Sequence, residues 1–154
     1  MLLLLLPVLL LSAQPIKAQS LAEYLERDWH GFYKGYSDVF TDGEYYLQYQ
    51  MFNVIASDVD NSFTATMTGV INIEGTLYNA TWAVTGSITS DYNVYLNYNY
   101  TVSSDALPEG LTWIYGNLTG ELYSDSESEG DLIIKGTSGI SAGDSFELVT
   151  FVEN

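Results

Sequence analysis

Three consecutive stretches of the chain alternate apolar and polar residues with a period of two. They cover residues 61–73, 75–90 and 92–104, and each places its apolar residues on one face. Successive side chains of a β-strand point to opposite faces, so this pattern predicts half-buried antiparallel strands. Weaker strand patterns flank them at 32–37, 44–55, 111–123, 131–137 and 145–152. The sequence therefore predicts an all-β protein of about eight strands.

Acidic residues mark the boundaries between these stretches. Between Tyr45 and Gly120 acidic residues are sparse, and no Lys or Arg occurs. Each connection is short enough for a hairpin or small loop, so the simplest topology is an antiparallel meander. Such a meander closes into an up-and-down β-barrel, with a two-layer β-sandwich as the alternative. Leu21, Leu25 and Trp29 recur every four residues, which predicts a short N-terminal helix plugging one barrel end.

The N-terminal segment has the character of a signal peptide. Residues 2–11 read LLLLLPVLLL, which is too short for a membrane-spanning helix of about 20 residues. Small residues favour cleavage after Ala18 or after Ser20, and a retained anchor is the alternative. We expect a cleaved signal peptide at 1–20 and a single β-barrel domain at 21–154. The protein would be secreted, or periplasmic in a bacterial host, with no membrane association after cleavage.

Composition excludes several classes of function. The 154 residues include no cysteine and one histidine, His30, which excludes disulfide scaffolds, thiolate nucleophiles and multi-histidine metal sites. With 20 Asp and Glu against 4 Lys and Arg, and a formal charge of −16, we expect no nucleic-acid partner. No Gly-rich phosphate loop joins a strand to a helix, and no cofactor is expected.

The sequence contains few candidate catalytic side chains. His30 lies beside Trp29 at the start of the predicted barrel, where packing or capping is its favoured role. Two carboxylates suffice for glycoside hydrolysis, but the sequence singles out no pair among its acidic residues. We therefore expect a protein that is not an enzyme, with a carboxylate-pair glycosidase as the enzymatic alternative.

The densest acidic run, residues 124–131, invites a calcium hypothesis, because calcium takes several carboxylate oxygens. The run does not fit the EF-hand spacing, since the twelfth position counted from Asp125 is Gly136 rather than Glu. Alternate loops of a meander share one barrel end, which would gather this run with Asp58, Asp60 and Asp91. A solvated acidic loop is the favoured interpretation, and no metal site is predicted.

Many of the 13 tyrosines fall on the apolar faces of the predicted strands. A barrel interior lined by tyrosines can hold a small molecule, because ligand sites are apolar cavities with a few placed polar groups. The favoured alternative places them near strand ends with their hydroxyls in water. The candidate ligand-binding residues are Tyr45, Tyr49, Tyr78, Trp82, Tyr98 and Tyr100.

The predicted outer walls are uncharged and rich in Thr, Asn and Tyr. Three glycosylation sequons, at Asn79, Asn99 and Asn117, fall on these walls, and we expect occupancy in a eukaryotic host. Exposed sheet is normally kept soluble by charge, so uncharged walls suggest a covering glycan, a second copy or a glycan ligand. Aromatic side chains are also predicted to project there: Tyr95, Trp113, Tyr115 and Tyr123.

Two short segments, Gly31-Phe32-Tyr33 and Ser90-Asp91-Tyr92, approximate the Gly-x-Trp and Thr-Asp-Tyr motifs of lipocalins. With its length, strand number and export, the chain resembles the small secreted binding barrels of the lipocalin and avidin families. It departs from both, since no arginine follows Arg27 and the avidin Trp-x-Asn opening is missing. The resemblance implies a barrel that binds a small ligand and assigns no residue to its site.

Two functional hypotheses follow. The first is a secreted, non-enzymatic binding module of lipocalin or avidin size, holding a small aromatic or partly polar ligand in a tyrosine-lined interior. The alternative is a structural or adhesive extracellular protein that self-assembles into a homo-oligomer, or binds glycans, through its uncharged outer walls. The hypotheses differ in whether the interior or the outer face carries the function.

Overall fold

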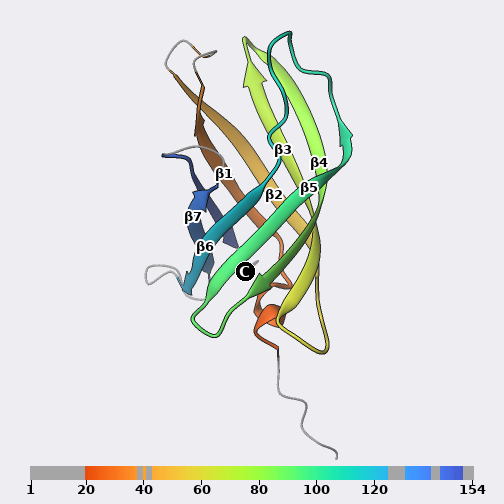
Figure 1. Cartoon of the computed structure of the whole chain (residues 1–154), viewed down its shortest axis with the longest axis vertical. Coiled ribbons are helices and arrows are strands. Elements are labelled where there is room, and N and C mark those ends of the chain that lie inside the picture. The colour runs from red at the N-terminus through yellow and green to blue at the C-terminus, as the bar shows by residue number, and fades with distance from the viewer. Residues whose placement is uncertain (1–19, 38–39, 41–42, 125–130, 140–142, 151–154) are drawn as a thin grey trace, which may run out of the picture.

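The computed structural model describes residues 20–37, 40, 43–124, 131–139 and 143–150. An antiparallel sheet of eight strands closes on itself in sequence order, because β1 pairs with both β2 and β8. This order confirms the predicted up-and-down barrel and excludes the sandwich, and Figure 1 shows the strands winding around one axis. The strands are β1 (Trp29–Tyr36), β2 (Glu44–Ala56), β3 (Ser62–Ile73), β4 (Thr76–Ile88), β5 (Asn93–Ser104), β6 (Asn117–Ser124), β7 (Leu132–Ser138) and β8 (Ser145–Thr150).

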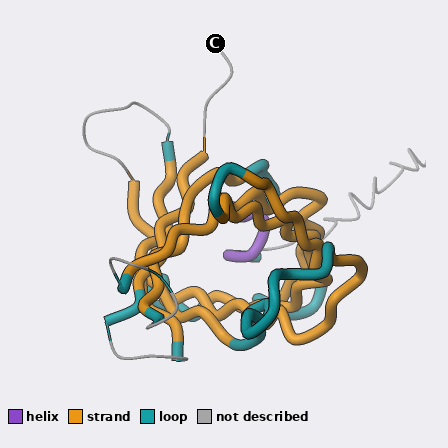
Figure 2. The backbone as a smooth tube through the Cα atoms, turned by 90° about the horizontal axis from the view of Figure 1, so that it is seen from above, coloured by secondary structure: helices purple, strands orange, loops and turns teal. Residues whose placement is uncertain are grey.

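The lower end of the barrel is closed by a single 3₁₀ turn, η1 (Leu21–Leu25), where the sequence predicted a short helix. Ser20 and Glu23 cap this turn reciprocally. The Ser20 hydroxyl accepts a hydrogen bond from the backbone N–H of Ala22, and the Glu23 carboxylate accepts one from the backbone N–H of Ser20. Ala22 and Leu25 are fully buried. Figure 2 shows the turn inside the outline of the barrel seen from above. No helix in the described residues is long and apolar enough to span a membrane.

The barrel interior is packed with large side chains. Trp29, Tyr33, Tyr49, Trp82 and Tyr98 all have exposed fractions of 0 or 1%. Inward glycines make room for these rings. A Cβ built at position 69 would lie 2.7 Å from the ring of Trp82, which is closer than carbon atoms approach. Glycine at this position therefore allows two bulky aromatic residues, Tyr49 and Trp82, to face each other across β3.

The two walls of the barrel differ in height. β2, β3, β4 and β5 have 12 or 13 residues each, whereas β6, β7 and β8 have 8, 7 and 6. The long strands rise beyond the short ones at the upper end, opposite η1, and residues 105–116 pass over this end on their way to β6 (Figure 1). Residues 111–116 were predicted to begin a strand. They form none, and β6 starts at Asn117.

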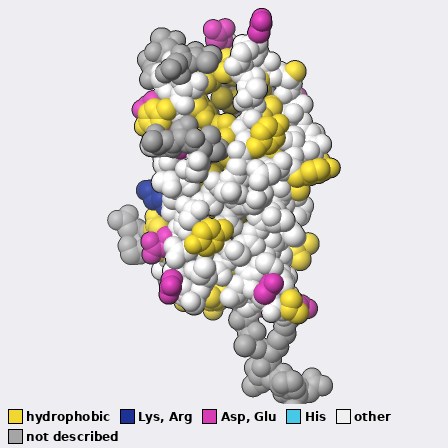
Figure 3. All heavy atoms as spheres, in the orientation of Figure 1, with side chains coloured by type: hydrophobic (Ala, Val, Ile, Leu, Met, Phe, Trp, Pro, Cys, Tyr) yellow, Lys and Arg dark blue, Asp and Glu magenta, His cyan; other side chains and the backbone are white. Residues whose placement is uncertain are grey.

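The outer wall formed by β3, β4 and β5 carries little charge. The face in Figure 3 is mostly uncharged, and its acidic side chains lie mainly toward the two ends. Two lysines on the other strands pair with neighbouring glutamates: Lys34 with Glu44 at 2.7 Å, and Lys135 with Glu147 at 2.8 Å. The described cations on the outer wall are thus already neutralised by partners on adjacent strands.

Candidate functional site

An aromatic cluster occupies the centre of the barrel. Tyr49 of β2, Trp82 of β4 and Tyr98 of β5 meet edge to face, with ring centroids 5.8 to 6.5 Å apart. Trp113, from the segment over the upper end, adds a fourth ring 5.8 Å from Trp82. Edge-to-face pairs stabilise beyond the area they bury. These three strands and one connecting segment therefore hold the rings in a fixed arrangement.

A second group of rings connects this cluster to the upper end. Tyr33 of β1 lies 6.1 Å from Tyr49 and 6.0 Å from Tyr45, measured between ring centroids. Phe40 stacks on Tyr45 at 5.3 Å. Together with the central cluster, these rings form a continuous column from the upper end of the barrel to its centre. We call it the aromatic column, and it consists of Phe40, Tyr45, Tyr33, Tyr49, Trp82 and Tyr98.

Five buried polar atoms along this region have no hydrogen-bond partner among the described residues. Nearly all buried polar groups in proteins are bonded, so each exception needs an explanation. The matched donors in the same chain are satisfied: the indole N–H groups of Trp29 and Trp113 donate to backbone carbonyls at 3.1 and 2.8 Å. The unpartnered atoms are Tyr49 Oη, Trp82 Nε1, Tyr98 Oη, Thr101 Oγ1 and Asp144 Oδ1.

A buried carboxylate lies beside the column. Asp144, 2% exposed, directly precedes β8. Its Oδ2 accepts hydrogen bonds from Tyr33 Oη and from Ser138 Oγ, the latter at 3.1 Å. Both protein donors use the same oxygen, so Oδ1 is left with none. The result is a half-satisfied carboxylate in the barrel interior.

The interior phenols are protonated donors at neutral pH. Burial raises the pKa of Tyr98 to about 12. Burial also raises the pKa values of Tyr49, Tyr33 and Tyr45 above the usual value for tyrosine. For Tyr33, the hydrogen bond to Asp144 raises the pKa further. The described interior thus combines neutral hydroxyl and indole donors with one carboxylate, a set suited to binding a polar small molecule.

The structure brings together some of the predicted ligand-binding residues. Tyr49, Trp82 and Tyr98 lie in the central cluster, and Tyr45 lies on the column near the upper end. Tyr78 is half-buried and packs against the core without a ring contact to the others. The predicted placement of Tyr100 in the barrel interior is wrong, because its side chain is 70% exposed.

An irregularity in β5 explains Tyr100. The β4–β5 pairing joins Thr85 to Asn97 but Ala83 to Tyr100, so β5 holds one extra residue between these pairs. A bulge of this kind reverses which residues face inward. Thr101 consequently turns its hydroxyl into the interior in place of Tyr100. The uninterrupted alternation of the sequence carries no signal of this extra residue.

Sequence reasoning also missed part of the site. Trp113 was predicted to project outward but is 8% exposed, because residues 111–116 cover the barrel end instead of continuing the sheet. Asp144 and Ser138 were not singled out, since they resemble ordinary turn residues. A signal for Tyr33 was present: Trp29, Gly31, Tyr33 and Gly35 alternate large and small residues along one face of β1.

The described structure leaves little space at the upper end of the barrel. The cavity there has a volume of about 40 Å³ and is lined by apolar side chains that include Phe40, Leu107, Leu111 and Trp113. That volume holds water, whereas ligand sites measure roughly 300 to 1,000 Å³. The hollow is therefore too small for a ligand as the side chains stand, and binding at the column requires some of these side chains to move.

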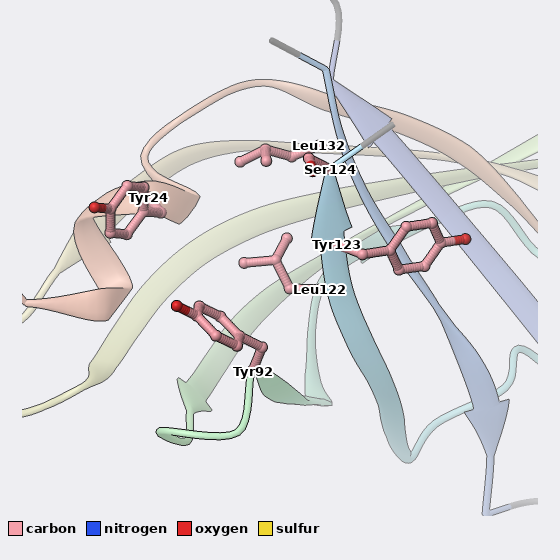
Figure 4. Close-up of a pocket in the computed structure, with 6 residues that line it drawn as sticks. All are labelled: Tyr24, Tyr92, Leu122, Tyr123, Ser124 and Leu132. Atoms are coloured by element: carbon pink, nitrogen blue, oxygen red, sulfur yellow. The ribbon is translucent and has the colours of Figure 1, made fainter. Parts of the chain in front are cut away.

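Larger hollows lie elsewhere on the molecule. One of about 430 Å³ lies between η1 and β6, lined by residues that include Tyr24, Tyr92 and Leu122. In Figure 4 the ring of Tyr123 points away from the other lining side chains. Tyr24 and Tyr92 are about half exposed, at 47% and 49%, and none of the buried unpartnered atoms lines this hollow. It lacks the positioned polar groups that the column has.

The remaining candidate residues lie outside the barrel interior. Asn79, Asn99 and Asn117 are exposed on β4, β5 and β6. His30 is half-buried and lines a shallow hollow on the outer face of β1. Residues 125–130 of the acidic run lie outside the described residues. Among the residues that the structure does describe, no group of three or more candidate metal ligands occurs.

Comparisons of the chain with protein-family models, with curated proteins and with solved structures find no significant match. The geometry of the barrel is therefore the basis on which a function can be proposed.

Proposed function

We propose that the protein is a secreted, non-enzymatic module that binds a small molecule along the aromatic column. One observation carries this proposal: the buried polar atoms without partners are concentrated around Tyr49, Trp82, Tyr98 and Asp144. A ligand with its own donors and acceptors supplies the missing hydrogen bonds. Binding, rather than catalysis, is supported by the chemistry of the column, which consists of neutral donors and a single carboxylate.

Buried polar groups without a hydrogen-bond partner lower the stability of a protein. A buried polar group without a partner costs about 1–3 kcal/mol. Replacing Tyr98 by Phe would remove that cost while keeping the packing. Pairing of these atoms with the polar groups of a ligand is the role that we propose for them.

The segment 105–116 provides the route to the column. Its first residue is fixed to β4, because Asn79 N–H donates to Asp105 Oδ2 at 2.8 Å. At the other end of the segment Tyr98 N–H donates to Gly116 O at 3.1 Å. Between these anchors the segment has no helix or strand, and its apolar residues cover the upper end. Outward movement of Trp113 and its neighbours would open the column while the barrel stays intact.

The test is a ligand screen on the purified protein with a matched variant. Thermal shift and tryptophan fluorescence are measured against lipids, pigments, small aromatics and short glycans. Trp82→Phe keeps a ring at this position and removes the indole N–H, so we expect it to weaken any ligand found. Tyr24→Phe, in the lower hollow, is the control and should bind normally. Equal loss in both variants, or no loss in either, would place the ligand outside the column.

A second candidate function uses the outer wall. A hollow of about 480 Å³ crosses β4, β5 and β6, and its lining includes Tyr95, Asn97, Asn117 and Thr119. An exposed aromatic ring beside amide and hydroxyl groups suits a sugar ligand or a second copy of the chain. The same wall carries the three sequon asparagines, which we propose as glycosylation sites in a eukaryotic host.

This second candidate is tested on the same wall. Glycan-array binding and sedimentation velocity are compared for the wild type, for Tyr95→Ser and for Tyr123→Ser, an exposed tyrosine of β6 outside this hollow. If the wall binds glycans or a second copy, Tyr95→Ser abolishes it and Tyr123→Ser does not. A monomer that binds no glycan after enzymatic deglycosylation would exclude this function.

A further inference from the structure

We infer that the ligand of the column is a small organic amine whose ammonium group pairs with Asp144 Oδ1. The inference rests on the proposed function and names the chemical class of its ligand. It starts from the asymmetry of the carboxylate, where Tyr33 and Ser138 both bond to Oδ2 and none of the described groups bonds to Oδ1. In an ionised carboxylate Oδ1 is an acceptor, so the missing partner is a donor.

The charge balance of the chain specifies a cation. A buried carboxylate is costly unless it is paired. Lys34 and Lys135 are held by Glu44 and Glu147 on the outer wall and do not reach the interior. With 4 Lys and Arg in the whole sequence, the chain has few cations to offer this site. An ammonium group brought by a ligand supplies both the missing hydrogen bond and the missing charge.

The surroundings of Asp144 also favour a cation. The ring of Tyr33, which is bonded to the carboxylate, lies 6.0 Å from Tyr45, on which Phe40 stacks. Aromatic faces attract an ammonium group, most strongly where water is excluded. An anionic ligand would be repelled by Asp144, and a neutral one would leave the carboxylate unpaired.

The rings between Asp144 and Trp82 limit the size of the ligand. Tyr33 and Tyr49 lie between the carboxylate and Trp82, with ring-centroid distances of 6.1 Å from Tyr33 to Tyr49 and 6.1 Å from Tyr49 to Trp82. The ligand that pairs with Asp144 is therefore small and carries an ammonium group on a short apolar or aromatic body. Tyramine has this composition and serves as the probe.

The experiment compares three molecules of similar shape and different charge by isothermal titration calorimetry. Tyramine is the cation, 4-ethylphenol the neutral analogue and 4-hydroxyphenylacetate the anion. We expect tyramine to bind the wild type at least about 10-fold more tightly than 4-ethylphenol, since a hydrogen bond to a charged group contributes that much or more. The anion should bind more weakly than either.

Two variants locate the effect. Asp144→Asn keeps the shape and an acceptor for Tyr33, and should remove the preference for tyramine while 4-ethylphenol binds as before. Glu147→Gln, which removes an outward carboxylate of β8, the strand that Asp144 precedes, should leave the preference intact. If Asp144→Asn does not fold, the charge series on the wild type still decides the ligand class.

The outcomes separate the two proposals. Equal binding of tyramine and 4-ethylphenol would overturn the amine inference and support the column as a site for neutral ligands. Binding of neither, while the screen finds a ligand sensitive to Trp82→Phe, overturns the amine inference alone. If no compound in either experiment depends on Trp82 or Asp144, the proposed function itself is wrong.

Discussion

Tyr33 and Tyr98 are residues of the same type, both at 0% exposure in the same barrel, yet only one of them is bonded through its hydroxyl. Tyr33 donates to Asp144, whereas the Tyr98 hydroxyl makes no hydrogen bond of ordinary geometry and interacts with the neighbouring Tyr49 hydroxyl. This contrast between two tyrosines is the residue-scale basis of the functional argument, because a group that stabilises the fold and a group kept for a ligand respond differently to removal.

The first prediction compares Tyr98→Phe with Tyr33→Phe. Removing an unpartnered hydroxyl removes a desolvation cost, so Tyr98→Phe should leave the free energy of unfolding unchanged or raise it. Tyr33→Phe should lower it by about 1–3 kcal/mol, because it deprives a buried carboxylate of a donor. Urea denaturation measures both. Strong destabilisation by Tyr98→Phe would mean that this hydroxyl is bonded, for instance to buried water, and would remove a main argument for a ligand.

At the scale of the element, the segment 105–116 is the part of the fold that the function requires to move. It contributes Trp113 to the core while its neighbour Tyr115 is 50% exposed, so the two aromatic residues are natural counterparts for an experiment. Loops of this length without secondary structure are commonly functional covers of a site.

The second prediction concerns this cover. Trp113→Ala should lower the free energy of unfolding by about 3–5 kcal/mol, because it removes a large ring from the core. Tyr115→Ala should change it by less than about 0.5 kcal/mol. In stopped-flow experiments Trp113→Ala should also speed ligand association, since the upper end is less covered. Unchanged association in a folded Trp113→Ala protein would argue against this route to the column.

The third prediction concerns η1. The Ser20 hydroxyl accepts from Ala22 N–H and donates to Asp60 O at 3.0 Å, which ties the turn to the β2–β3 connection. Cleavage after Ala18, the earlier of the two expected sites, keeps Ser20 in the mature chain. In a chain that begins at Gln19, Ser20→Ala should cost about 1 kcal/mol, and Ser20→Asp, which keeps the capping acceptor, should cost less. Thermal unfolding monitored by circular dichroism measures the difference. Equal stability of both variants with the wild type would mean that the cap does not hold η1 in place.

The elements differ in how well their sequences predict them. β3 and β4 have unbroken alternation and uniform pairing along their whole length, so the sequence pattern is sufficient. β5 pairs with β4 in three registers, and the two irregularities between them depend on contacts with β4 that no local pattern records. Leu111 to Tyr115 have strand-like composition but cover the barrel end. Tertiary packing overrides local preference there, which is why Trp113 was assigned to the wrong side.

At the scale of the whole molecule, barrel closure follows from the sequence because short connections and alternating faces leave few topologies. The candidate site does not follow in the same way. Asp144, Ser138 and Tyr33 are separated by up to 111 positions along the chain and meet only because β1 and β8 are neighbours in the closed barrel. Closure itself therefore creates the carboxylate cluster.

The fourth prediction concerns alkaline pH and the barrel as a unit. The folded chain holds the phenolic protons of Tyr33, Tyr49 and Tyr98 at a higher pKa than the unfolded chain, where the usual value is 10.0. Above that pH the unfolded state binds fewer protons, so the free energy of unfolding falls as pH rises from 10.0 through about 12, the pKa of Tyr98.

Phenolate absorbance and circular dichroism, followed together, test this account of alkaline stability. A first group of exposed tyrosines should titrate with the fold intact, and the interior group should titrate only as the barrel unfolds. Tyr98→Phe should reduce the second step by one tyrosine. Titration of all tyrosines in one step before unfolding would contradict the burial of these phenols.

The most direct test of the ligand site uses the three tryptophans as internal probes in a nitrogen–proton correlation spectrum. Trp82 Nε1 has no partner in the described structure, whereas Trp29 and Trp113 donate to backbone carbonyls. On titration with a bound ligand, the indole N–H of Trp82 should move downfield and become protected from exchange, that of Trp113 should shift as the cover moves, and that of Trp29 should stay. A ligand that binds without moving the Trp82 signal would contradict the account.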